Sequence, residues 1–423
     1  MKLYIHIIVA FLALAIGYPY GGTNFILLMA PYLVYMVLKC DAIFLPALML
    51  HCASETSATS IVFISFIILS IIRVKELSAL RLGRLFWVLM GMIPIFVWLV
   101  VSSITKYGMY PPLAVSQIGY YLSFFAFFYG VLVSNTFSKS VLNSIYVTLF
   151  IAYILYVSGI IEFTRIIVGF SFLFASALAI YLSFKTKNLI LLPFSVFAFL
   201  SVILITEEST LTTLSVSILS LLLAYLYFKD KTRLIQRITG IIPFIIIVLI
   251  YFIGISGYLS ADRSSTPDKL NISGFRDIRN WIYYKVFFDR AAFWAGGFNQ
   301  ILDYKHLFPI PEMPDIVAVL KNRAEVEITF GSHTTMIELI RKYGIIAGVM
   351  LNVCLVYIVV ISRKVMRIYE INPFMIPLFA MSIVTTIVLT LTGQYQIMPG
   401  YAILSMGILG VAYSTYSENI LLE

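Results

Sequence analysis

Apolar runs of about 17 to 25 residues recur along this chain, and each is long enough to cross a hydrocarbon core about 30 Å thick as a helix. Lipid offers the backbone no hydrogen-bond partners, so only helices and closed β-barrels span a membrane. The alternating segments of about ten residues that build β-barrels are absent. A composition of 61% hydrophobic and 12% charged residues also excludes a water-soluble globule. The sequence therefore predicts an all-α polytopic membrane protein.

The hydrophobic pattern predicts about 12 to 14 transmembrane helices. The candidate spans are residues 3–19, 22–38, 41–53, 57–72, 85–104, 113–134, 140–161, 166–184, 188–205, 210–228, 238–258, 337–362, 372–391 and 397–416. The weakest is 41–53, because it is short and contains Pro46 and His51. This segment leaves the exact number of spans open.

The basic residues of the short loops concentrate on one side of the predicted bundle, whereas the other side holds Lys106 and Arg165. The larger set is Lys2, Lys39, Arg73, Lys75, Arg81, Arg84, Lys139, Lys185, Lys187, Lys229, Lys231, Arg233, Arg237, Arg363, Lys364 and Arg367. Cytoplasmic loops carry such an excess, so both termini are predicted to be cytoplasmic. The net charge of +9 follows from this topology, and no nucleic-acid partner is predicted.

One long hydrophilic stretch interrupts the apolar pattern, and the predicted topology places it on the outer side of the membrane. It divides the chain into an N-terminal transmembrane helix bundle at 1–258, a large extracytoplasmic loop at 259–336 and C-terminal transmembrane helices at 337–423. Basic and acidic residues nearly balance within this loop, so a surface for a plain polyanion is not predicted. The loop is nevertheless where polar chemistry gathers, and we expect the functional site there.

An amphipathic helix is predicted in the loop stretch FRDIRNWIYYKVFFDRAAFWAGGFNQ, residues 275–300. Its apolar residues recur at a helical period, which is typical of a helix lying along a membrane surface. Arg276 and Arg279 are three residues apart and therefore neighbours on that helix. The pattern ends at the glycine pair 296–297, where we expect a turn, and the proline-rich stretch HLFPIPEMPD predicts a loop after it.

These features resemble the O-antigen polymerase and O-antigen ligase superfamily of bacterial envelopes. The resemblance rests on the long penultimate outer loop, on Trp281 and the Gly-Gly-Phe run at 296–298, and on His333 followed by Gly344 and Gly348. It implies a glycosyltransferase-C-like fold in the bacterial inner membrane, with the active site facing the periplasm.

The resemblance also implies glycosyl transfer from a sugar chain carried on undecaprenyl diphosphate. Fixed cations stabilise such a leaving group, and arginine binds phosphate oxygens bidentately. The candidates for diphosphate binding are Arg276, Arg279, Arg341 and Arg165. Arg165 is included because family members often carry a Ser-Arg pair where this chain has Ser209 followed by Thr210. His333 is the candidate catalytic base, because a histidine titrates in the range needed to accept a proton from the attacking hydroxyl.

Other polar residues of the outer side have both a structural and a functional interpretation. The candidates for the substrate cleft are Glu207, Glu208, Glu338 and Trp281. Glu338 lies three residues before Arg341 and is expected to pair with it. His306 is a rival base, ranked lower because Pro309 and Pro311 predict a mobile position.

Some neighbouring residues have plain structural interpretations. Gly344 and Gly348 are expected to allow close helix packing. Lys342 is expected to extend to the outer lipid headgroups. His6 and His51 lie in or beside early spans, where a packing or an interfacial role is expected.

The leading functional hypothesis is a polymerase that transfers the growing glycan from its undecaprenyl diphosphate carrier to the next carrier-linked repeat unit. The nearest alternative is a ligase that transfers the glycan to lipid A core. A polysaccharide flippase or transporter is the alternative from another class, although transporters place charges near the membrane midplane and show two similar halves. The predicted partners are an undecaprenyl diphosphate-linked oligosaccharide, membrane lipids and a polysaccharide chain-length regulator. No cofactor and no metal is predicted, because the loop lacks carboxylates at ligand spacing.

Overall fold

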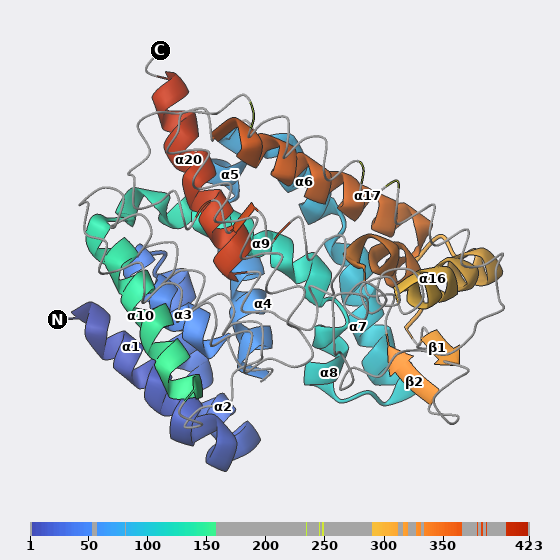
Figure 1. Cartoon of the computed structure of the whole chain (residues 1–423), viewed down its shortest axis with the longest axis horizontal. Helices are drawn as coiled ribbons and strands as arrows, with labels where there is room; N and C mark the ends of the chain where they lie inside the picture. The colour runs from blue at the N-terminus through green and yellow to red at the C-terminus, as the bar shows by residue number, and fades with distance from the viewer. Residues whose placement is uncertain are drawn as a thin grey trace, which may run out of the picture.

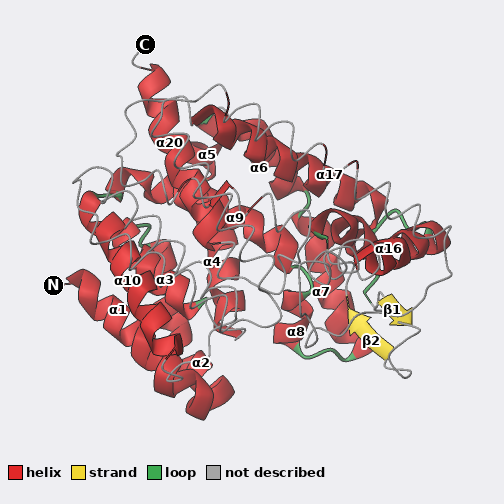
Figure 2. Ribbon diagram, viewed as in Figure 1, coloured by secondary structure: helices red, strands yellow, loops and turns green. Residues whose placement is uncertain are grey.

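The computed structural model describes the chain in several ranges. These are residues 2–52, 57–80, 82–157, 290–311, 316–319, 327–330, 334–365 and 403–421, with the single positions 234, 245, 248, 379, 382, 383 and 386. The described part is mostly helical, as the hydrophobic pattern predicts (Figure 2). The predicted spans from 166 to 258, apart from Ile245 and Val248, and most of the span at 372–391 lie outside the described residues.

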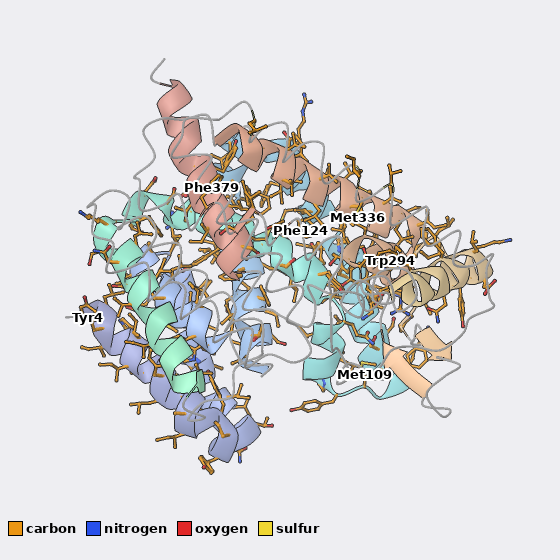
Figure 3. All side chains as sticks on the ribbon, in the orientation of Figure 1. Tyr4, Met109, Phe124, Trp294, Met336 and Phe379 are labelled. Carbon is orange, nitrogen blue, oxygen red and sulfur yellow. The ribbon has the colours of Figure 1, made fainter. Side chains whose placement is uncertain are left out.

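Helices build the N-terminal part of the chain up to residue 157. They are α1 (Lys2–Leu12), η1 (Ala13–Gly17), α2 (Tyr18–Leu38), η2 (Ala42–Phe44), α3 (Leu45–His51), α4 (Ser57–Ile72), α5 (Val74–Ala79), α6 (Gly83–Gly91), α7 (Ile93–Tyr107), α8 (Pro111–Ser116), α9 (Gly119–Val133), η3 (Ser134–Thr136) and α10 (Lys139–Val157). Helix α9 is buried along almost its whole length; it runs through the middle of the assembly and packs against α4 (Figure 1). Its labelled Phe124 lies among the side chains of this core (Figure 3).

The C-terminal part adds helices around α9 and a small extension at one end of the molecule. Its elements are α16 (Arg290–Tyr304), β1 (Ile316–Val319), β2 (Glu327–Phe330), α17 (Thr335–Val365), η7 (Ile403–Gly407) and α20 (Ile408–Leu421). Helix α20 packs on α9, and α16 packs on α17 and β1 (Figure 1). The strands pair antiparallel, with Ile316 opposite Phe330. This hairpin is a local exception to the helical fold, and its branched and aromatic residues suit a pleated strand.

Three helical stretches of the described part are long and apolar enough to cross a membrane: Leu3–Leu38, Gly83–Tyr107 and Thr335–Ile361. Shorter apolar helices cover Ala42–His51 and Ala58–Ile72. Every residue of α3 is buried in the core, so the predicted span at 41–53 is a short internal helix. At about 1.5 Å per residue, its helical turns are too short to cross a hydrocarbon core.

The first long apolar stretch is a helical hairpin that turns at Gly22. This residue has φ 50° and ψ −139°, a conformation open to glycine and strained for other residues. The His6 Nδ1 and Tyr32 Oη atoms lie 2.6 Å apart, whereas a straight helix would separate these residues by about 39 Å. The predicted spans 3–19 and 22–38 are therefore two packed helices joined at Gly22.

Helix α17 is broken in the same way at Gly344, where φ is 79° and ψ is 171°. The Asn352 side-chain amide donates a hydrogen bond to the Met336 carbonyl at 2.9 Å. A straight helix would place these residues about 24 Å apart, so residues 335–343 fold back onto the following part of α17. That following part, 345–365, is about 30 Å long and matches the thickness of a hydrocarbon core by itself.

Two hydrogen bonds between distant segments lie at different ends of the molecule, one near α3 and α10 and the other near α8 and α16 (Figure 1). At one end, the Ala42 amide donates to the Thr136 hydroxyl at 2.8 Å. At the other end, the Gln117 side-chain amide donates to the Pro311 carbonyl at 3.2 Å. The second end is where the short segment after α16 meets α8 and α9, and it carries the candidate site.

Candidate functional site

A buried ion pair lies at the loop end of α17. Arg341 Nε donates to Glu338 Oε2 at 2.9 Å, and Nη2 donates to Glu338 Oε1 at 2.5 Å. Arg341 is 0% exposed and Glu338 is 1% exposed. The expected pairing of these two residues is confirmed, in the bidentate geometry that makes arginine–carboxylate bonds strong.

Two further side chains complete this polar cluster. Arg341 Nη1 donates to Gln300 Oε1 at 2.9 Å, which ties α17 to α16. Lys342 Nζ lies 3.5 Å from Glu338 Oε1, and its side chain is 26% exposed. Lys342 therefore also faces the Glu338 carboxylate, in addition to any contact with lipid headgroups.

The break at Gly344 is covered by the segment Lys305–Phe308, which we name the strap. The Ile345 amide donates to the His306 carbonyl at 3.0 Å, and the Ile346 amide donates to the Leu307 carbonyl at 3.2 Å. These amides have lost their helical acceptors at the break, and the strap replaces them. A Cβ on Gly344 would lie 2.6 Å from the Leu307 carbonyl oxygen, so the close approach of the strap also requires glycine.

The two glycines of α17 thus have different roles. Gly344 forms the break and admits the strap, which the sequence did not predict. Gly348 confirms the expected close packing, since a Cβ there would lie 2.4 Å from the Ile340 Cα. The packing partner is the folded-back part of the same helix rather than a separate one.

His306 is held in the strap by its side chain as well as its backbone. Its Nε2 lies 2.9 Å from the Arg341 carbonyl oxygen. A carbonyl only accepts hydrogen bonds, so Nε2 carries the proton and Nδ1 carries the lone pair. Burial lowers the pKa of the imidazole more than the hydrogen bond to Arg341 raises it, and the Arg341 charge lowers it further. His306 is therefore a neutral imidazole near pH 7.

The prediction of a mobile His306 is wrong. The prolines that follow it keep the strap out of a helix, and its carbonyls are then available to α17. Gln117 fixes the far end of the segment, because it binds the Pro311 carbonyl while its own side-chain oxygen accepts from the Ser103 hydroxyl at 2.9 Å. The Tyr343 hydroxyl donates to the Gln117 carbonyl at 2.7 Å and brings α17 to the same place.

The glycine pair in α16 also behaves differently from the prediction. Residues 296 and 297 lie inside a continuous helix that ends at Tyr304, so no turn occurs there. Gly297 is buried, and α16 packs against both α17 and β1. Tertiary packing therefore outweighs the roughly 1 kcal/mol that a glycine costs in a helix interior.

Of the site residues predicted from sequence, the structure brings Glu338 and Arg341 together. The others lie outside the described residues: His333, Arg276, Arg279, Arg165, Glu207, Glu208 and Trp281. Reasoning from sequence missed Gln117 and Gln300. The signal that could have found them is that glutamines are rare in such apolar surroundings, where a polar side chain needs a partner.

Arg341 has no open face towards a ligand in this conformation. Its guanidinium is fully buried and its nitrogens bind Glu338 and Gln300. Binding a diphosphate directly would require the pair with Glu338 to open, and leaving either charge buried alone costs several kcal/mol. The geometry suits a residue that holds the loop end of α17 in shape.

No protein-family model matches the chain, and no curated protein and no solved structure is significantly similar to it. Within the described ranges, no group of three or more His, Cys, Asp or Glu side chains gathers as a metal site.

Proposed function

We propose that this protein is an O-antigen polymerase of the bacterial inner membrane, with a polytopic, glycosyltransferase-C-like bundle. It transfers the growing glycan from undecaprenyl diphosphate to the next carrier-linked repeat unit on the periplasmic side. The observation that carries this proposal is the buried Glu338–Arg341 pair, held with Gln300 beneath the strap. Charges buried at the end of an apolar helix are expensive and mark functional sites.

The proposed chemistry needs two kinds of group. Arginines of the outer side, Arg276, Arg279 and Arg165, bind the diphosphate and stabilise its charge as the carrier leaves. Arg341 acts indirectly: its hydrogen bonds to Glu338 and Gln300 hold α17 and α16 together next to the loop. A histidine accepts the proton of the attacking hydroxyl, and His333 is the candidate that the sequence pattern favours.

The way the break in α17 is satisfied argues against the transporter alternative. Transporters use the free ends of broken helices to bind ions or substrates near the membrane midplane. Here the amides of Ile345 and Ile346 and the carbonyl of Arg341 bind the strap instead. The strap therefore fixes the conformation of α17 at the break, and a fixed conformation suits an enzyme that needs a rigid site.

The surface glycan of cells lacking this protein tests the proposal. Loss of a polymerase leaves single repeat units on lipid A core, and restoring the chain restores the long glycan. Long glycan that stays on the undecaprenyl carrier would instead identify a ligase. Repeat units that remain on the cytoplasmic face would identify a flippase, and both results would contradict polymerisation.

A further inference from the structure

We infer that the strap is a lipid-binding surface that lies in the outer leaflet of the membrane. The side chains of Leu307 and Phe308 enter the boundary between the lipid headgroups and the acyl chains, and the partner is the phospholipid around α17. This inference goes beyond the proposed function, because it concerns the depth of the strap and does not depend on glycan transfer.

Two hydrogen bonds fix the depth of the strap relative to α17. The Ile345 amide donates to the His306 carbonyl at 3.0 Å, and the Ile346 amide donates to the Leu307 carbonyl at 3.2 Å. Ile345 and Ile346 begin the part of α17, residues 345–365, that is long enough to cross a hydrocarbon core by itself. The strap therefore crosses α17 where this span enters the hydrocarbon.

The strap side chains at this depth are apolar and exposed. Leu307 and Phe308 are each 54% exposed, and exposed apolar side chains continue along α17 from Ile345 and Ile346 to Val353. A continuous apolar surface of this kind is unfavourable in water, whereas acyl chains cover it without that cost. The apolar surface of the strap therefore extends the surface that α17 presents to lipid.

The backbone of the strap suits the headgroup boundary better than the hydrocarbon core. Irregular backbone in contact with hydrocarbon leaves polar groups without partners, at a cost of several kcal/mol for each. The Lys305 amide donates to the Ile301 carbonyl at 3.0 Å, and Pro309 and Pro311 have no amide hydrogen to satisfy. At the boundary, water reaches the remaining backbone groups while the apolar side chains enter the acyl region.

Three tyrosines at the same end of the molecule support this depth. Tyr304 precedes the strap, whereas Tyr107 ends α7 and Tyr110 precedes α8, and all three are about half exposed. The hydrogen bond from Gln117 to Pro311 joins α8 to the segment after the strap (Figure 1). Tyrosines are enriched at the membrane–water interface, because the ring contacts acyl chains while the hydroxyl stays hydrated.

Spin labels on single cysteines measure the depth of the strap. In a Cys40→Ser background the other native cysteines are buried, and the labelled variants are Phe308→Cys, Asp303→Cys and Val353→Cys, each at an exposed position. The full chain is placed in phosphatidylethanolamine and phosphatidylglycerol vesicles without undecaprenyl carrier. Oxygen concentrates among acyl chains and a nickel chelate in water, so the ratio of their collision rates with the label rises with depth. We expect the ratio at Phe308 to lie between the low value at Asp303 and the high value at Val353.

Two results would overturn the inference. A ratio at Phe308 equal to that at Asp303 would place the strap in water. Low accessibility to both probes would mean that protein covers the strap, either another segment or a second copy of the chain. The same measurement on Leu307→Cys decides the question if Phe308→Cys does not fold. The polymerase proposal is tested separately by the glycan, so either proposal can fail while the other stands.

Discussion

Helices α2 and α17 each break at a glycine with positive φ, but the two breaks have different structural roles. At Gly22 the surrounding space is open, because a Cβ added there would have no atom within 4 Å, and the turn joins two apolar helices. At Gly344 the strap crosses directly over the break, and three buried or partly buried polar residues, Glu338, Arg341 and His306, surround it. A glycine break builds a site only where a second segment arrives to satisfy the freed backbone groups.

The polar residues of the two regions also differ in what they connect. Beside the N-terminal hairpin, His51 of α3 is fully buried and its Nδ1 lies 2.7 Å from the hydroxyl of Tyr18 in the hairpin, among aromatic rings. This confirms the packing role expected for His51. Around Gly344 the polar residues instead connect three segments, α16, the strap and α17. Only the second region therefore couples the loop to an apolar helix.

The largest expected effect comes from separating the ion pair. Glu338→Ala leaves Arg341 buried without its carboxylate, which should lower the free energy of unfolding by about 3–5 kcal/mol. Unfolding of the purified protein in lipid discs measures it. The matched control is Glu338→Leu combined with Arg341→Met, which removes both charges and should be far milder. Equal losses in the single and double variants would mean that the pair is not electrostatically important.

A smaller effect should distinguish the two glycines directly. Gly22→Ala and Gly344→Ala both force a side chain into a strained backbone conformation, at a cost of about 1–3 kcal/mol each. Gly344→Ala additionally overlaps the Leu307 carbonyl, which is backbone and cannot rotate away, so we expect a further loss of about 1–3 kcal/mol. Thermal unfolding of the two variants under identical conditions gives the comparison. If Gly22→Ala were the more damaging of the two, the strap would not be packed on Gly344.

The sequence predicted what depends on neighbours along the chain. Runs of apolar residues predicted the long helices, and the three-residue spacing of Glu338 and Arg341 predicted their pairing. The break at Gly344 could not be predicted in this way, because it depends on a strap that lies 35 residues upstream of Arg341 where His306 binds it. The contact between Gln117 and Pro311 joins residues 194 positions apart, and no local period encodes it.

Reconstituted polymerisation tests the proposed function most directly. The purified protein is placed in lipid vesicles with undecaprenyl diphosphate-linked repeat units and excess EDTA, and the carrier-linked products are separated by length. We predict a ladder of longer carrier-linked glycans that EDTA does not suppress, because the positive charge at the diphosphate comes from arginines. Repeat units that stay single, in vesicles where the protein is folded, would contradict glycan transfer. A ladder that appears only when magnesium or manganese is restored would contradict the assignment of that charge to arginine alone.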